Sequence, residues 1–213
     1  RLYSHLYLSS AVKKSLKISL LIHLMHTKYL IQYKKMILNQ DDLMQRLRFL
    51  RHIYADAYLS AGVIRNLVWS NLHQQNYALN SCEIDVIFFD ENEKNQTITQ
   101  NLAQKLVEQF PENEWDVVNQ AQVHTWYLTE QLQPILPYCS LYDALSAWPE
   151  TATAIAIRLL DNDDFDIIAP FGLNDLFELK LRWNDRLVSH AVFQQRIESK
   201  KFLTRWPQLK IED

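Results

Sequence analysis

Two carboxylates, Glu83 and Asp85, open the most strand-like segment of the sequence, EIDVIFFD at residues 83–90. Alternate side chains of a strand share a face, so these two should lie about 7 Å apart along it. Carboxylates that converge in this way can bind one or two divalent cations. Asp116, in the apolar segment WDVVNQ, is the candidate for a third carboxylate on a neighbouring strand. The alternative is that Glu83 and Asp85 form only the solvated end of a strand.

Gly62, one of two glycines in 213 residues, ends an expected strand, AYLSAG, and opens an expected helix. A glycine at such a turn lets the backbone approach a phosphate, and the free N–H groups of a helix N-terminus attract anions. Arg65 and Asn66 fall in the first helical turn, where a guanidinium can pair with phosphate oxygens. A tight turn without a ligand is the alternative for Gly62. Together with the acidic strand, the turn predicts an anion cradle that faces a metal site.

The surrounding segments predict an α/β (α+β) fold in which helices flank a mixed central sheet. A helix of about 15 residues is expected after Asn39, followed by the order strand, helix, strand, helix, strand. The three strands of this series are AYLSAG, EIDVIFFD and WDVVNQ. Further along, TAIAIRLL and FDIIAP predict a hairpin, and the turn between them, residues 161–164, is expected to be exposed despite its likeness to a calcium loop. The segment HAVFQQRIESKKFLTRW is expected to be helical, whereas LNDLFELKLRW is ambiguous.

Charge divides the chain into two parts. Residues 1–35 hold seven of the 22 basic side chains and none of the 25 acidic ones. Met36 opens a conventional-looking sequence, so we expect residues 36–213 to form a single domain. We expect residues 1–35 to be a basic N-terminal extension that lies outside the native protein, with a basic surface-binding arm as the alternative.

Composition excludes several classes of protein. The acidic main body argues against a broad nucleic-acid surface, and the apolar run within residues 1–35 is shorter than the roughly 20 residues of a membrane span. We therefore expect neither partner. Cys82 and Cys139 lack metal-ligand spacing and suit a reducing compartment, so a cytoplasmic location is expected. The sequence contains no Walker loop, zinc HExxH motif or serine-hydrolase elbow.

Several motifs resemble the polymerase-beta-like nucleotidyltransferase superfamily. Its minimal pattern is a glycine pair or Gly-Ser that opens a helix, then Asp-x-Asp/Glu on a strand and a third acid on another strand. AGVIRN resembles the Gly-Gly-x-Val-Arg-Asp turn of transfer-RNA CCA-adding enzymes, and PFGLNDL resembles their Asp-Pro-Phe-Gly-Gly-x-x-Asp-Leu segment. A group of uncharacterised bacterial nucleotidyltransferase-family proteins shares AGxxRNxxW, DIDVxxFD, WxVxNQAxxH, WPETATA, APxGLxDLF and a terminal WP. The resemblance covers nearly everything after Met36.

This resemblance implies a site and a reaction. The residues that would hold the triphosphate of a nucleotide are Gly62, Arg65 and Asn66. The catalytic residues that would hold Mg²⁺ or Mn²⁺ are Glu83, Asp85 and Asp116. The metals would bridge the phosphates of a nucleoside triphosphate and assist in-line attack on the α-phosphorus, which releases pyrophosphate. The acceptor is unknown and could be a small molecule, a protein or an RNA end.

Two positions depart from the family pattern. Ala61-Gly62 stands where the superfamily usually has Gly-Gly or Gly-Ser, and Glu83 stands where the nearest relatives have Asp. The extra methylene of Glu83 moves its carboxylate by about one C–C bond and could alter the metal geometry. Two hypotheses follow: a metal-dependent nucleotidyltransferase, or a catalytically inactive nucleotide-binding or interaction protein that retains the fold.

Other polar residues have both functional and structural interpretations. Glu150, in WPETATA, could contact the base or ribose of the nucleotide or serve as another third acid, or it could cap a helix or begin a strand. Asn119, Gln120 and His124 could line the pocket beyond the third acid, although a hydrogen-bonded structural role is more common for such a histidine. Asp175 fits the charge of a helix N-terminus at least as well as a site residue.

Overall fold

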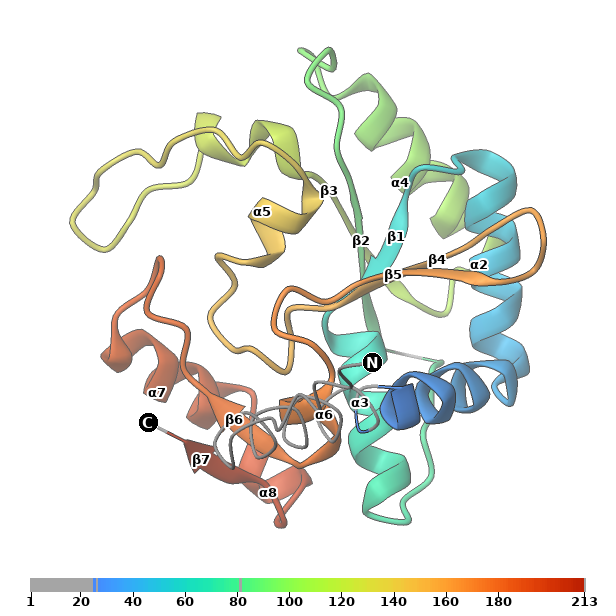
Figure 1. Ribbon diagram of the computed structural model, residues 1–213. Coiled ribbons are helices and arrows are strands. Elements are labelled where there is room, and N and C mark those ends of the chain that lie inside the picture. Colours follow the sequence, from blue (N-terminus) through green and yellow to red (C-terminus); the bar gives the residue numbers. More distant parts are fainter. Residues whose placement is uncertain (1–24, 26, 81, 213) are drawn as a thin grey trace, which may run out of the picture.

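A five-stranded mixed sheet with the order β3-β2-β1-β4-β5 forms the centre of the molecule (Figure 1). The computed structural model describes residues 25, 27–80 and 82–212. The strands are β1 (Tyr58–Ser60), β2 (Glu83–Phe88), β3 (Glu114–Asn119), β4 (Ala156–Leu159) and β5 (Phe165–Ile168). Strands β2 and β3 are parallel, and the other neighbours are antiparallel. The predicted fold class with a mixed central sheet is therefore confirmed.

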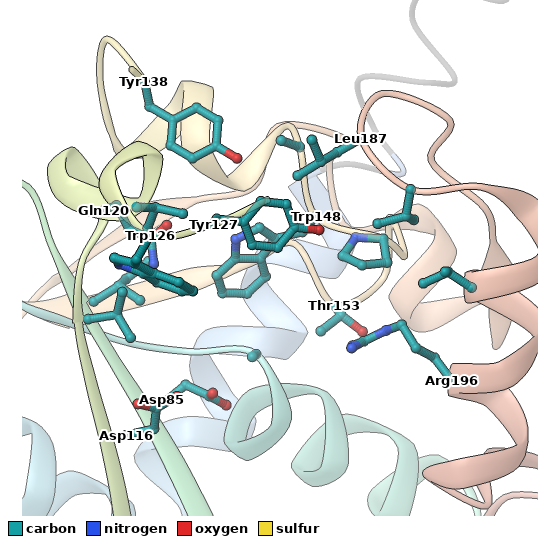
Figure 2. Close-up of a pocket in the computed structure, with 18 residues that line it drawn as sticks. Asp85, Asp116, Gln120, Trp126, Tyr127, Tyr138, Trp148, Thr153, Leu187 and Arg196 are labelled. Carbon is teal, nitrogen blue, oxygen red and sulfur yellow. The ribbon is translucent and has the colours of Figure 1, made fainter. Parts of the chain in front are cut away.

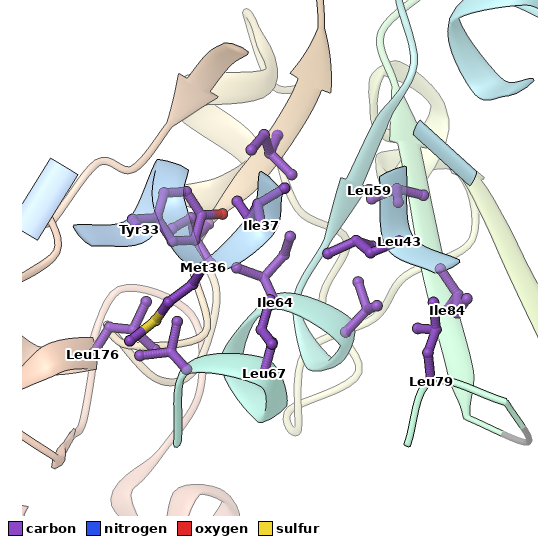
Figure 3. Close-up of a cluster of buried hydrophobic side chains, with 14 of the residues drawn as sticks. Tyr33, Met36, Ile37, Leu43, Leu59, Ile64, Leu67, Leu79, Ile84 and Leu176 are labelled. Atoms are coloured by element: carbon purple, nitrogen blue, oxygen red, sulfur yellow. The ribbon is translucent and has the colours of Figure 1, made fainter. Parts of the chain in front are cut away.

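Three amphipathic helices form the main hydrophobic core with one face of this sheet. They are α2 (Asp41–Ile53), α3 (Gly62–Leu72) and α4 (Thr97–Gln109). Leu43 of α2 and Ile64 of α3 meet Leu59 of β1 and Ile84 of β2 in this core (Figure 3), because apolar residues recur on one side of each helix. Within the described residues, no helix has both the length and the apolar character needed to cross a bilayer.

The opposite face of the sheet is only partly covered. Because side chains alternate along β2, Ile84 and Val86 enter the main core while Asp85 and Ile87 point to the other side. Ile87 packs there in a second cluster with Leu145 of the short helix α5 (Leu141–Leu145). The 3₁₀ helix η1 (Gln120–Thr125) follows β3 directly. The sheet beside Asp85 is left open to a cavity.

The C-terminal third lies against one side of α3 (Figure 1). Its elements are α6 (Asn174–Phe177), β6 (Lys180–Arg182), α7 (His190–Ser199), α8 (Phe202–Arg205) and β7 (Lys210–Glu212). The ambiguous segment after Gly172 contains both a helix and a strand, and β6 pairs with β7 in parallel. The expected single helix is divided in two, since Lys201 adopts a left-handed φ of 53° between α7 and α8. The predicted hairpin is confirmed by the antiparallel pair β4 and β5.

A helix runs through the expected boundary at Met36. Residues 27–38 are helical, and Tyr33 and Ile37 are 0% exposed within the same core as α2 and α3 (Figure 3). Lys34 also forms an ion pair of 2.6 Å with Asp164 in the β4–β5 turn. The origin of residues 1–35 stays a prediction, but their last turns pack as part of the domain; residues 1–24 lie outside the described range.

Candidate active site

A cavity of about 410 Å³ opens on the half-covered face of the sheet. Figure 2 shows Asp85 and Asp116 on one side of it and Arg196 of α7 on the other, with Thr153 beside Arg196. Four aromatic side chains contribute to the lining: Trp126, Tyr127, Tyr138 and Trp148. The cavity thus combines an acidic wall with a wall that is cationic and aromatic.

The acidic wall follows from the register of β2 and β3. Asp85 pairs with Asp116 across the parallel strands, so both carboxylates lie side by side on the cavity face. The backbone N–H of Gly62 donates a hydrogen bond to Asp85. Burial, followed by the negative charge of Glu83, raises the pKa of Asp85 to about 6 and also raises the pKa of Asp116. The structure therefore concentrates negative charge where the sequence predicts it.

Glu83 lies at the rim beside these two aspartates. Its side chain is 55% exposed, and Nζ of Lys200 lies 3.8 Å from its Oε2. It does not line the cavity, although its charge reaches both aspartates. In the part of the chain that the structure describes, no group of three or more His, Cys, Asp or Glu side chains is arranged to hold a metal ion. The two aspartates alone still offer the hard oxygen ligands that Mg²⁺ and Mn²⁺ prefer.

The turn before α3 carries its conformational strain at Ala61. Ala61 has a φ of 53° and a ψ of −119°, whereas Gly62 is the first residue of the helix and does not have such a left-handed φ. A Cβ atom on Gly62 would lie 3.6 Å from Nη2 of Arg65 and 3.8 Å from Oδ2 of Asp85, which is ordinary contact. The position that favours glycine is thus the one where this chain departs from the Gly-Gly pattern.

Arg65 is buried beneath the turn. Its Nη1 group donates to Oγ1 of Thr153, and its Nε and Nη2 groups donate to Oδ1 of Asn66. The guanidinium also lies 4.5 Å from the ring centre of Phe202 in α8. Burial lowers the pKa of Arg65 to about 10. Neither Arg65 nor Asn66 lines the cavity. The guanidinium of Arg65 is instead bound to Thr153 and Asn66 and packs on Phe202 of α8.

Glu150 is completely buried and also lies outside the cavity lining. Its Oε1 atom accepts a hydrogen bond of 2.7 Å from Nε of Arg196, and its Oε2 atom accepts one of 3.4 Å from Nη2. Burial lowers the pKa of Arg196, but the bond and charge of Glu150 raise it more. Arg196 is 34% exposed and lines the cavity. Sequence reasoning missed Arg196, since nothing in its own segment distinguishes it from a surface arginine.

The aromatic wall was also missed. Trp126, Tyr127 and Tyr138 come from residues 126–140, which form an irregular loop with one bridge between Leu128 and Pro134. The available signals were the density of aromatic residues after β3 and the position of Trp148 inside the motif WPETATA. Neither signal fixes the direction of a side chain, because a loop has no periodicity.

The remaining predicted residues divide between lining and support. Gln120 lines the main cavity, and Asn119 lines a neighbouring cavity of about 260 Å³. Asn119 is buried, accepts hydrogen bonds from the backbone N–H groups of Asp90 and Ala121, and so fixes the end of β3. His124 does not line the main cavity. Asp175 lies in the first turn of α6 and binds Thr151 and Arg182, which fits its structural interpretation.

Solved structures that share this fold include CCA-adding enzymes. An NMR structure described as revealing a CCA-adding enzyme head domain matches with a TM-score of 0.72 and 28% identity, over 85% of this chain and 94% of that one. Apo form II of a CCA-adding enzyme matches with a TM-score of 0.54 and 17% identity, over 84% of this chain and 44% of the enzyme. A CCA-adding enzyme in complex with CTP matches with a TM-score of 0.53 and 16% identity, over 84% of this chain and 43% of the enzyme. This chain therefore spans less than half of either enzyme.

The sequence comparisons identify the family. No curated protein sequence matches the chain. A sequence model described as nucleotidyltransferase matches residues 51–211, which include β1, β2, β3 and the whole cavity lining. The predicted resemblance and the polymerase-beta-like fold are both confirmed, and the chain belongs to the nucleotidyltransferase family.

Proposed function

We propose that this protein is a metal-dependent nucleotidyltransferase that transfers a nucleoside monophosphate from a nucleoside triphosphate to an acceptor, with release of pyrophosphate. The observation that carries the proposal is the pair Asp85 and Asp116, held side by side on the cavity face by the parallel register of β2 and β3. The N-terminus of α3 lies next to this pair, and its first N–H donates to Asp85. A carboxylate pair beside a helix N-terminus suits a phosphate chain that carries a divalent cation.

Asp85 and Asp116 are the residues that would hold Mg²⁺ or Mn²⁺, while Glu83, the other carboxylate that the sequence predicts as a metal ligand, lies outside the cavity lining. Their oxygen ligands fit a hard cation, and burial, followed by the negative charge of Glu83, raises the pKa of both aspartates. When bound, the metal would neutralise charge on the phosphates and polarise the α-phosphorus. The protein's own contribution is to hold the phosphates in line and to keep the base in place.

The opposite wall offers contacts for the rest of a nucleotide. Tyr127 and Trp148 present aromatic faces on which a base can stack. Stacking accepts any base, so this wall alone does not select one nucleotide. The complex of a CCA-adding enzyme with CTP, at 16% identity, supports a nucleoside triphosphate as the donor here. The acceptor could be a small molecule, a protein or an RNA end.

A second function, nucleotide binding without transfer, is favoured by one observation. Glu83 is half exposed, lies near Lys200 and is not among the residues that line the cavity. A site with only two carboxylates could retain a nucleotide and its cation without reaching the geometry of transfer. Pyrophosphate release distinguishes this function from the first.

The test begins with thermal melting of the full chain in the presence of each of four nucleoside triphosphates, with and without Mg²⁺ or Mn²⁺. We expect at least one nucleotide to raise the melting temperature only when metal is present. Asp85→Asn should abolish that rise, while Asp56→Asn, an exposed aspartate paired with Arg158, should retain it. Pyrophosphate release with that nucleotide would establish transfer chemistry. Equal stabilisation of the wild type and the Asp85→Asn variant would contradict the proposal.

A further inference from the structure

Arg196 presents a free edge to the cavity. Its Nε and Nη2 groups are bonded to Glu150, and among the described residues its Nη1 group has no acceptor. The side chain lies across the cavity from Asp85 and Asp116, on the far side of the α3 N-terminus (Figure 2). An anionic chain that begins at the two aspartates and runs past the helix N-terminus would end at this guanidinium.

Glu150 fixes the direction of Arg196. It is 0% exposed, and its backbone is bound on both sides, by a bridge to Trp183 and by the N–H groups of Thr153 and Ala154. A buried carboxylate held in this way gives its partner one orientation, since a guanidinium bonds a carboxylate through a planar fork. The charge of Glu150 also attracts the guanidinium of Arg65. The three side chains together carry one net positive charge.

We propose that Arg196 binds the terminal phosphates of the nucleoside triphosphate and that Glu150 is a positioning residue, which acts only by holding Arg196. This inference rests on the proposed function for the identity of the ligand. It reassigns Glu150: the carboxylate is sealed from the cavity and cannot reach base or ribose. Asp85 and Asp116 then hold one end of the triphosphate and Arg196 the other.

A double-mutant cycle with sodium tripolyphosphate tests this division of roles. Isothermal titration of the full chain is made in Mg²⁺ and again in EDTA, for the wild type, Glu150→Gln, Arg196→Gln and the double variant. Arg196→Gln should weaken binding by about tenfold or more, because a charge-assisted contact is lost, and Glu150→Gln should weaken it less. If Glu150 acts through Arg196, the double variant binds no more weakly than Arg196→Gln alone.

Controls separate a binding effect from misfolding. The double variant removes both charges of the Glu150–Arg196 pair, so neither residue of the pair is left as an ion without its partner if either single variant is unstable. Arg186→Gln, an arginine outside the cavity that pairs with Asp143, should bind like the wild type. Binding of the nucleoside monophosphate should be nearly equal in the wild type and in Arg196→Gln, because the terminal phosphates are absent from it.

Two kinds of result overturn the inference. One is tripolyphosphate binding that is absent from the wild type or unchanged in Arg196→Gln. The other is additive losses in the double variant, which would mean that Glu150 contacts the ligand itself. Failure of the proposed function gives a different result: tripolyphosphate binding still depends on Arg196, but no nucleoside triphosphate releases pyrophosphate.

Discussion

The two walls of the cavity are built in different ways. The acidic wall consists of residues in register on adjacent parallel strands, Asp85 and Asp116, and its geometry is that of any parallel pair. The opposite wall joins elements that are far apart in sequence: Arg196 is fixed by Glu150, 46 residues earlier, and the loop that carries Tyr127 is fixed to Ser189 by Glu130. Regular backbone positions the first wall, whereas individual side-chain contacts position the second.

The two walls also carry different chemical groups. The strand wall carries negative charge, which under our proposal faces a metal cation, and the opposite wall carries Arg196 and aromatic faces, which under our proposal face the phosphates and base of a nucleotide. Ser189 is also the N-cap of α7, the helix that carries Arg196, so Glu130 connects the aromatic loop to that helix. Changes in one wall should therefore affect one part of the ligand and leave the other part bound.

The largest effect is expected from Asp85→Asn. Loss of a metal ligand removes several kcal/mol of transition-state stabilisation, so metal-dependent pyrophosphate release should fall by at least about 100-fold. Binding of tripolyphosphate in EDTA should be unchanged or tighter, because a repelling charge has been removed from the opposite wall. Asp56→Asn serves as the control. Loss of metal-free tripolyphosphate binding in Asp85→Asn would show that the walls do not act separately.

A substitution in the main core, on the face of the sheet opposite the cavity, should lower the stability of the whole domain and should not affect one wall more than the other. Tyr33→Ala removes a side chain that is 0% exposed in the core, and urea unfolding should show a loss of about 3 kcal/mol. Ile31→Ala, on the exposed side of the same helix, should change stability little. If Tyr33→Ala were as stable as the wild type, the last turns of residues 1–35 would not belong to the folded domain.

Tyr127→Ala should weaken binding through the base of the nucleotide, whereas Arg196→Gln should weaken binding through its terminal phosphates. Loss of a stacking surface worth about 1–3 kcal/mol would weaken binding of the nucleoside triphosphate by roughly 5- to 150-fold and leave tripolyphosphate binding unchanged. Titration of both ligands into one variant gives the comparison. Tyr142→Ala, an exposed tyrosine outside the cavity, is the matched control. If both ligands lost affinity equally, Tyr127 would maintain the shape of the cavity and would not stack on the base.

The charge of the strand wall should also make the free energy of unfolding depend on pH. The pKa of Asp85 is raised from 3.8 to about 6, chiefly by burial, so the folded state holds its proton more tightly than the unfolded state does. Its contribution to stability is therefore greatest below pH 4 and is lost as the pH rises through 6, a total on the order of 3 kcal/mol. Chemical unfolding of the metal-free wild type and Asp85→Asn at several pH values gives this difference. A constant difference from pH 4 to pH 7 would contradict the charge concentration that we describe.

The smallest effect is expected where the walls meet. Ala61 lines the cavity and has a conformation that favours glycine, so Ala61→Gly should stabilise the metal-free protein by about 1 kcal/mol. Ala154→Gly, a buried alanine without a positive φ, should destabilise it instead. Both are measured by urea unfolding. A destabilised Ala61→Gly variant would show that the methyl group contributes more packing than its backbone costs.

Local sequence patterns were sufficient for the sheet and for one wall of the cavity. Alternation in EIDVIFFD predicts which side chains of β2 share a face, and the parallel neighbour then places Asp116 beside Asp85. The burial of Arg65 could not be predicted in the same way, since Phe202 of α8 covers it from far along the chain. The roles of Glu150 and Arg196 likewise depend on a contact between distant segments. Periodicity predicts faces of elements, but it contains no information about which elements meet.

The most direct test of the central claim is electron paramagnetic resonance of Mn²⁺ titrated into the full chain with the stabilising nucleoside triphosphate. We predict that the wild type binds Mn²⁺ together with the nucleotide, and that Asp85→Asn and Asp116→Asn each lose this bound Mn²⁺ while Asp56→Asn retains it. Unchanged Mn²⁺ binding in both cavity variants would contradict the account, because the metal would then be held away from the strand wall.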